Sequence, residues 1–506
     1  MRGIAQERCT SDNKHMRHVL PGIRRIGAPV GAIAAVVGAL ALAAPGVALA
    51  SNRHGPKIDD AVAQAAAMTS TTTPIPVIVF GNQSAGFDPS LRGAVDLGFA
   101  TAGSVAAGDL DAIASDPNVS YVAPDIAMAP LARPGERIGG GTSAGSAQAL
   151  YPIVDDAQAA WNAGFAGKGI GIAVVDSGVD KGSLGSRLVA RTGLRSGVDR
   201  LGHGTLVADF AAGDLNGQYM GIAPQASVID VSVGRSDGGV YTSDVVAGLL
   251  WVLANKDQFN IRVVNLSLAE TAPSSYTTSL LDSVVELLWR SGVVVVTAAG
   301  NGGPGSENYA PGNDPFAIAV GATDSNGTAD PSDDTVAPWS STGPTLDGIA
   351  KPDLVAPGRL VTGYLPPNTL LGQEAPAQNW VANNVVAISG TSFSAAQAAG
   401  AAADVLQAHP DWTPDQVKAV LEVSGRPQAG SAAPALDVGA AVFAQGNPAQ
   451  ANQGIPYSTF GVSSSGPIVS THIRWSAAGW NAAGWNAAGW NAAGWNAAGW
   501  NGFGWT

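Results

Sequence analysis

The chain has 506 residues, enough for more than one domain, and its 65 glycines and low charged fraction of 13% are typical of a compact protein with many tight turns. The single cysteine, Cys9, excludes intrachain disulfides, thiolate metal clusters and a cysteine nucleophile in the body of the protein. Residues 1–50 carry six Lys/Arg and two Asp/Glu, a net +4; because the whole chain carries −13, the rest carries −17. An acidic body argues against a nucleic-acid partner.

Residues 1–50 are predicted to be a signal peptide for secretion. An apolar stretch at 30–44 follows several arginines and precedes the small-residue motif "ALA" at 48–50, which fits a cleavage site. The apolar core is short and interrupted by prolines, which argues against a membrane span. An uncleaved membrane anchor is the alternative interpretation.

Residues 51–126 are predicted to form a small α+β unit. "IPVIVF" (75–80) is typical of a strand, and a short helix pattern before Asp116 is followed by the alternating strand pattern "VSYV" (119–122). Residues 127–150 are rich in Pro, Gly and Ser, which predicts a linker.

Residues 151–445 alternate apolar strands with helical segments, which predicts a doubly wound parallel sheet with helices on both faces. In such sheets, functional groups gather at the carboxyl ends of the strands. The predicted strands are "GIGIAVVDSG", "ASVIDVSV", "IRVVNLSL" and "GVVVVTAAGN", and the predicted helices between them are "TSDVVAGLLWVLAN" and "SLLDSVVELLWRSG".

The C-terminal part of the chain has no such pattern. Residues 446–474 are predicted to be a second linker, and "AAGWN" then occurs five times in succession within a repeat tail, 475–506. The tail's tryptophans recur every five residues, a step of about 140° beyond one helical turn, so they form no single helical stripe. The tail is either a low-complexity extension or a multivalent adhesive for a cell-envelope polymer.

Three residue types that together support nucleophilic catalysis stand at strand ends or helix starts. Asp176 ends "IGIAVVD", His203 lies between glycines in "GHGT", and Ser392 precedes an alanine-rich helical segment. Each has an ordinary alternative: a turn aspartate, a helix-start histidine and an N-cap serine. Asn301, which ends "TAAGN", either forms a turn or donates its side-chain amide to an oxyanion.

The chain order Asp176, His203, Ser392 is the order of the subtilisin triad. Six motifs in family order make the region 151–445 resemble the subtilisin-like serine peptidases: "VVDSGVD", "GHGT", "VNLSL", "AAGN", "KPDLVAPG" and "GTSFSAA". This resemblance implies an endopeptidase with a seven-stranded parallel sheet. Residues 74–125 resemble the inhibitory propeptide of the family, so residues 51–126 are predicted to be a propeptide and the protein a self-processed zymogen.

The resemblance also implies the role of each candidate. Ser392 would be the nucleophile, His203 the general base and then acid, and Asp176 the partner that orients the imidazole. The backbone amide of Ser392 and the side chain of Asn301 would form the oxyanion hole.

Substrate would bind by strand addition between the segments 266–270 and 238–241. Glu270 stands where the family commonly has glycine, and a partly buried carboxylate there would favour a basic substrate side chain. The residues that would contact substrate are Ser267, Leu268, Ala269, Ala298, Ala299 and Gly300.

The expected partners are protein or peptide substrates, the chain's own propeptide as inhibitor, and a cell-envelope polymer at the tail. The expected location is outside the cell, with retention at the cell surface if the tail is adhesive. No metal ligand set or cofactor is apparent in the sequence, although the family resemblance allows calcium. The alternatives are an inactive scaffold homologue, an α/β-hydrolase esterase, which the chain order disfavours, and a surface-binding protein built around the tail.

Overall fold

The computed structural model describes residues 57–81, 90–97, 100–137, 148–192, 198–235, 239–458, 462–463 and 466–467. The predicted signal peptide with Cys9 and the AAGWN repeat lie outside these described residues. Within the described part of the chain, no helix is long and apolar enough to cross a membrane.

The N-terminal unit is a four-stranded antiparallel sheet of order β2-β3-β1-β4 that is covered by helices. Its own core gathers Val77, Val79, Leu110, Ile113 and Val122, all at most 1% exposed. This is the α+β architecture expected from the sequence. The elements are α2 (Asp60–Ala67), β1 (Pro74–Gly81), β2 (Arg92–Asp96), β3 (Thr101–Ala106), α3 (Leu110–Ser115) and β4 (Val119–Pro124).

The larger unit is built on an eight-stranded sheet, as the alternation of apolar strands and helices predicts. Within it the strands β7-β10-β6-β11-β13-β14-β16 pair in parallel, and β15 adds an antiparallel edge. The strands are β6 (Gly171–Asp176), β7 (Leu188–Arg191), β10 (Ser227–Ser232), β11 (Ile261–Leu266), β13 (Val294–Ala298), β14 (Ile318–Asp324), β15 (Thr335–Val336) and β16 (Leu354–Pro357).

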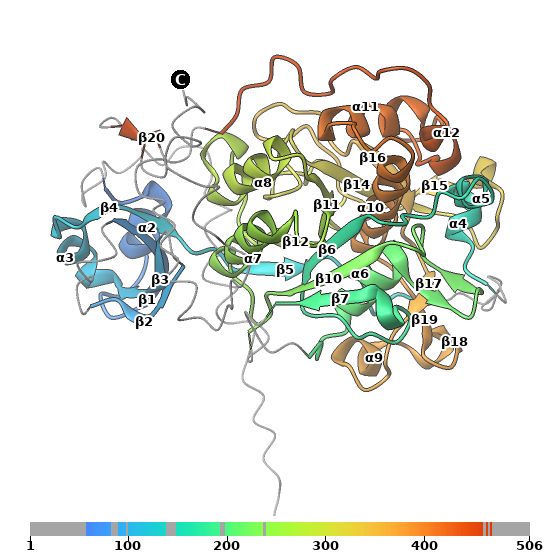
Figure 1. Cartoon of the computed structure of the whole chain (residues 1–506). Helices are drawn as coiled ribbons and strands as arrows, with labels where there is room; N and C mark the ends of the chain where they lie inside the picture. Colours follow the sequence, from blue (N-terminus) through green and yellow to red (C-terminus); the bar gives the residue numbers. More distant parts are fainter. Residues whose placement is uncertain are drawn as a thin grey trace, which may run out of the picture.

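Helices cover both faces of this sheet, which confirms the doubly wound fold class (Figure 1). α6 and α10 pack against each other on one face, and α7 and α8 pack against each other on the other. α10 approaches closely because it is made of small residues; a Cβ added at Gly400 would lie 2.7 Å from the Ala211 carbonyl oxygen of α6. These helices are α6 (His203–Ala212), α7 (Thr242–Asn255), α8 (Leu280–Arg290) and α10 (Thr391–Ala408).

Shorter elements complete the unit and surround the central layers (Figure 1). β17, β19 and β18 form a three-stranded sheet, and β8 pairs with β9. The bounds are α4 (Tyr151–Val154), α5 (Ala157–Asn162), β8 (Asp214–Leu215), β9 (Tyr219–Met220), β17 (Val361–Tyr364), α9 (Leu370–Glu374), β18 (Trp380–Ala382), β19 (Val385–Ile388), α11 (Pro414–Ser424) and α12 (Val438–Val442). β20 (Val462–Ser463) and β21 (Gly466–Pro467) pair antiparallel with each other as a separate two-stranded sheet.

The two segments predicted to be linkers are structured where the model describes them. In the first, β5 (Met128–Pro130) pairs antiparallel with β12 (Leu268–Glu270). In the second, residues 446–458, here called the C-terminal strap, fold back on the larger unit; the Tyr457 ring stacks on Phe316 with centroids 4.2 Å apart. Both segments gain their structure from tertiary contacts that composition alone does not indicate.

Candidate active site

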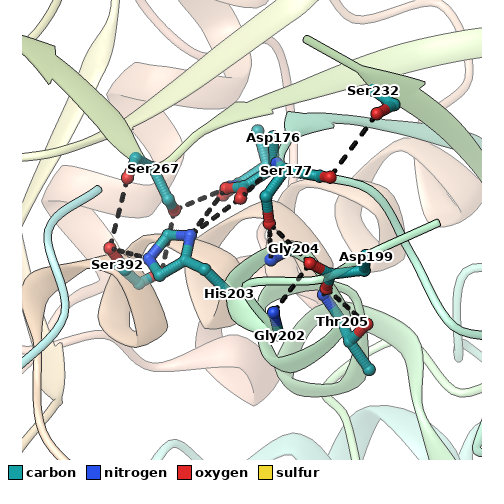
Figure 2. Close-up of polar contacts among 11 residues, drawn as sticks. Asp176, Ser177, Asp199, Gly202, His203, Gly204, Thr205, Ser232, Ser267 and Ser392 are labelled. Carbon is teal, nitrogen blue, oxygen red and sulfur yellow. Dashed lines mark hydrogen bonds and ion pairs between the residues drawn. The ribbon is translucent and has the colours of Figure 1, made fainter. Parts of the chain in front are cut away.

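Asp176 and His203 meet at the carboxyl edge of the sheet. Asp176 is the last residue of β6 and His203 the first residue of α6, and both are fully buried. His203 Nδ1 lies 2.8 Å from Asp176 Oδ1 and 2.9 Å from Oδ2 (Figure 2). Because an ionised carboxylate only accepts hydrogen bonds, this contact puts the imidazole proton on Nδ1 and leaves Nε2 as an acceptor.

Ser392 lies on the other side of the same imidazole. Its Oγ is 2.9 Å from His203 Nε2. Ser392 is the second residue of α10, and the N-cap of that helix, Gly390, has no side-chain cap. Ser392 is therefore not an N-cap serine, and its hydroxyl is aimed at the histidine.

Ser267 fixes the backbone at this serine. Its hydroxyl donates to the Ser392 carbonyl at 3.0 Å and accepts from Asn265 Nδ2 at 2.8 Å. The Ser392 hydroxyl also lies 3.3 Å from the Ser267 carbonyl oxygen. These contacts tie the end of β11 to the start of α10, so two segments far apart in the sequence hold the serine in place.

The loop before His203 is organised by Asp199, which the sequence analysis missed. The Asp199 carboxylate accepts from the Gly202 amide at 2.7 Å, the Ser177 hydroxyl at 2.9 Å and the Thr205 hydroxyl at 2.6 Å (Figure 2). Asp199 thereby ties the turn after Asp176 to the helix that carries His203. The nearest sequence signal is its position four residues before the histidine, which alone is uninformative.

Asn301 has one orientation that its contacts allow. Its Oδ1 accepts from the Thr391 backbone amide at 3.1 Å and from the Thr391 hydroxyl at 3.0 Å. Because the backbone amide can only donate, the oxygen of the Asn301 amide must face it, and Nδ2 points the other way. That Nδ2 donates to the Leu131 carbonyl oxygen at 2.7 Å.

The Leu131 carbonyl oxygen also receives the Ser392 backbone amide at 3.5 Å. The two donors predicted for an oxyanion hole thus converge on one peptide oxygen of the segment 126–133. A Cβ added at Gly390 would lie 2.5 Å from the same oxygen, so the close approach requires glycine at that position. This segment covers Ser392, which explains why the serine has no exposed surface.

The segment 126–133 is bound as an added strand. On one side β5 pairs with β12, with Leu268 opposite Pro130 and Ala269 opposite Ala129. On the other side the Met128 amide donates to the Val240 carbonyl at 2.8 Å. The two edges expected to bind substrate therefore flank this segment, although residues 236–238 lie outside the described part of the chain.

The proposed pocket residues lie next to Asn301. Ala298 ends β13, and Ala299 follows it, also buried. Gly300 has a positive φ of 109°, and its amide donates to the Thr391 hydroxyl at 3.2 Å. This turn, whose positive φ glycine adopts without a Cβ clash, delivers Asn301 toward the start of α10.

The structure differs from the expected environment of Glu270, and its described residues offer no side-chain cluster for calcium. Glu270 is not partly buried but 4% exposed, and its carboxylate accepts from the Thr242 hydroxyl at 2.7 Å and interacts with the Ser274 hydroxyl rather than with a basic side chain. For calcium, the described residues contain no group of three or more His, Cys, Asp or Glu side chains able to hold a metal ion. His409 lies away from the triad at the end of α10, where its ring stacks on Trp412.

Comparison with known proteins agrees with this fold. The subtilase family profile matches residues 167–447. Serine protease AprX of Bacillus subtilis (strain 168) is 37% identical over 271 residues, 51% of this chain and 61% of that protein. The alkaline protease of Alkalihalobacillus alcalophilus is 32% identical over 318 residues, 61% of this chain and 70% of that protein. Subtilisin Savinase of Lederbergia lenta is 34% identical over 270 residues, 52% of this chain and 85% of that protein.

The fold and the family match place this protein in the class of subtilisin-like serine peptidases. The chain belongs to the subtilase family. It matches about 61% of the length of AprX, so that similarity does not extend over either whole chain. The family profile, at residues 167–447, falls on the larger unit.

Proposed function

We propose that this protein is a secreted serine endopeptidase that is made as a self-processed zymogen. The observation that carries the proposal is the Leu131 carbonyl oxygen, which receives Asn301 Nδ2 at 2.7 Å and lies beside the nucleophile candidate Ser392. A peptide group held between a nucleophile and two oxyanion donors has the arrangement of a bound substrate.

In the proposed reaction, Ser392 Oγ attacks the carbonyl carbon of the bound peptide while His203 Nε2 accepts its proton. Asp176 holds the imidazole in the reactive tautomer and stabilises the imidazolium that forms. The charge that develops on the peptide oxygen is stabilised by Asn301 Nδ2 and the Ser392 amide. His203 then donates its proton to the leaving amine, and water hydrolyses the acyl-enzyme by the same steps.

The first substrate is the chain itself. The bond that follows the Leu131 carbonyl is Leu131–Ala132, so self-processing would leave Ala132 as the new N-terminus. Cleavage here lies within the predicted linker, 127–150, and it moves the end of the propeptide from residue 126 to residue 131. The proposed propeptide then acts as an inhibitor, because residues 126–131 keep the pairing partners of a substrate strand.

Replacement of Ser392 tests the function. The full-length Ser392→Ala variant should remain an uncleaved precursor and should not label with a fluorophosphonate, whereas the parent should release a chain that begins at Ala132. N-terminal sequencing and intact mass measure both outcomes. Cleavage at the same bond in the Ser392→Ala precursor would refute the assigned nucleophile.

A further inference from the structure

The chain beyond the Leu131–Ala132 bond stays in contact with the larger unit. The Arg133 amide donates to the Ser389 carbonyl at 2.7 Å, and the Arg133 guanidinium lies 5.2 Å from the centre of the Trp339 ring. A turn at residues 134–135 then leads to Glu136. The leaving side of the bond therefore contacts the larger unit at Arg133 and again at Glu136.

Glu136 is held by both its side chain and its backbone. Its Oε1 accepts from Arg359 Nε at 2.6 Å, and its carbonyl oxygen accepts from Asn379 Nδ2 at 2.8 Å. The side chain of Glu136 is 18% exposed and that of Arg359 36%, so the ion pair is partly shielded from water. Partial burial makes such a pair stronger than an exposed surface pair.

Both partners of Glu136 are fixed by the larger unit itself. Arg359 follows β16 and also pairs with Asp324, the last residue of β14. Asn379 is fully buried and donates to the Ala387 carbonyl of β19 at 2.9 Å. Neither side chain depends on Glu136 for its position, so the two form a preorganised site for a carboxylate and a peptide oxygen.

We propose that Arg359 and Asn379 form a substrate subsite that binds an acidic residue at the fifth position after the cleaved bond. The proposal rests on the proposed peptidase function and extends it to a preference on the leaving side of the substrate. Glu136 is the first occupant of the subsite. After self-processing, the new N-terminal segment 132–136 keeps these contacts and competes with other substrates for the subsite.

The test uses two internally quenched peptides. One copies residues 128–137, "MAPLARPGER", and the other has glutamine in place of its glutamate. The enzyme is the full chain with Glu136→Gln, so that its own segment binds the subsite less well. The acidic peptide should have a kcat/KM on the order of three- to tenfold higher, the range expected for one partly shielded charge-assisted contact. The difference should shrink in 1 M NaCl.

Variants of the enzyme identify the residue responsible. Arg359→Gln should abolish the preference. Arg262→Gln should keep it, because Arg262 instead contacts backbone carbonyls in the loop between α10 and α11. If Arg359→Gln does not fold, the precursor Glu136→Lys changes only the substrate side. It should self-process several-fold more slowly than the parent.

A substrate with no residues after the cleaved bond separates the two hypotheses. Met-Ala-Pro-Leu-p-nitroanilide should be hydrolysed by the parent and by Arg262→Gln at equal rates. If the parent does not hydrolyse it, the proposed peptidase function fails. If the parent hydrolyses it but the Glu136→Gln enzyme cleaves the two long peptides at equal rates, the subsite is refuted and the peptidase function stands.

Discussion

Asn301 is the residue whose removal isolates electrostatic stabilisation from the rest of the site. Asn301→Ala should lower kcat by roughly 10²–10³-fold, which is the loss known for the equivalent change in a subtilisin, a member of this same family. The KM should change little, because the donor acts on charge that develops in the transition state. Steady-state kinetics on the p-nitroanilide substrate measure both constants.

The prediction for Asn301 has a structural control. Thr391 holds the asparagine through its hydroxyl at 3.0 Å, so Thr391→Val should also lower kcat, but less than Asn301→Ala. A large rise in KM with unchanged kcat in Asn301→Ala would show that the amide binds ground-state substrate instead.

Asp353 is expected to stabilise the fold rather than to take part in catalysis. Its two carboxylate oxygens lie 2.7 Å from Lys351 Nζ and 2.8 Å from Lys418 Nζ, and all three side chains are buried. Burial alone would raise the pKa of Asp353, but the two lysines hold it below its ordinary value. Asp353→Ala should therefore lower the free energy of unfolding by about 3–5 kcal/mol, because two buried cations lose their counter-charge.

The measurement is denaturant unfolding in the Ser392→Ala background, which avoids self-digestion. Asp257→Ala is the matched control: its pair with Lys256 is 2.9 Å long but Asp257 is 85% exposed, so stability should be almost unchanged. Equal effects of the two substitutions would contradict the assigned role of burial.

At the scale of elements, the C-terminal strap (446–458) stabilises the larger unit. Tyr457 stacks on Phe316, and the Arg290 guanidinium lies 4.3 Å from the centre of the Tyr457 ring. The Ser458 amide donates to both oxygens of the buried Glu286 at 2.7 and 2.9 Å. Truncation after Gln445 should lower the melting temperature by several degrees, since it uncovers an aromatic ring and removes a partner of a buried carboxylate.

Truncation after Pro467 is the control, because it keeps the strap and removes only later residues. Thermal unfolding of both Ser392→Ala variants should separate them, and Tyr457→Ala should reproduce part of the loss, about 1–2 kcal/mol. Identical melting temperatures of the two truncations would show that the strap contributes no stability.

The contact between Asp125, which follows β4, and the start of α7 predicts a pH dependence for the proposed zymogen. Asp125 accepts from the Ser243 amide at 2.9 Å and the Ser243 hydroxyl at 2.8 Å at the start of α7. Burial raises the pKa of Asp125 to about 6, with Asp244 adding to the rise and Ser243 and Arg235 opposing it. In a released propeptide this carboxyl would titrate near its ordinary value of 3.8. At pH values between 3.8 and about 6, binding of the propeptide therefore takes up a proton. The affinity of the propeptide falls as the pH rises through about 6.

The cleaved propeptide should thus dissociate faster at pH 8 than at pH 5, with affinity falling about tenfold, because pH 5 lies one unit below the bound pKa of Asp125 and already above its free pKa. The lag before activity appears after self-processing measures this release. Asp125→Asn should flatten the dependence. Glu270 also faces this contact, and burial raises its pKa to about 7. The Glu270→Gln variant therefore shows how much of the pH dependence of the lag comes from Glu270 and how much from Asp125. An unchanged lag from pH 5 to 8 in the parent would contradict the prediction.

Elements with a clear periodic pattern of apolar residues could be predicted from the sequence. Elements that form only because another segment pairs with them could not. α7 (Thr242–Asn255) has the bounds of the predicted helix, because its apolar residues repeat at helical spacing. β5 was expected to be linker, since Pro and Ala have low strand preference, and it is extended only because β12 pairs with it. Asp199 was missed for a similar reason: a polar loop residue acquires its role from the four groups that fold around its carboxylate.

At the scale of the whole molecule, the triad, the oxyanion donors and the segment 126–137 form one site to which both units contribute. The N-terminal unit and the added strand are joined without a break, because β4 ends at Pro124 and β5 begins at Met128. Ile78, Phe80 and Ala123 of the N-terminal unit pack in the same apolar cluster as the core of the larger unit. This shared packing explains how a small unit can hold the Leu131 carbonyl in position before any bond is cut.

The repeat tail, 475–506, is predicted to act as an adhesive that the site does not need. Its tryptophans offer flat apolar faces that suit the rings of a sugar polymer, and several weak contacts on one tether gain avidity. No lysine or arginine follows Arg474, so attraction to an anionic envelope is a poor explanation for binding. Truncation after Pro467 should leave turnover of the p-nitroanilide substrate unchanged and shift the enzyme from the cell envelope to the medium. Cell fractionation of the parent and the truncated protein measures the shift; equal partitioning would leave the tail as a low-complexity extension without an adhesive role.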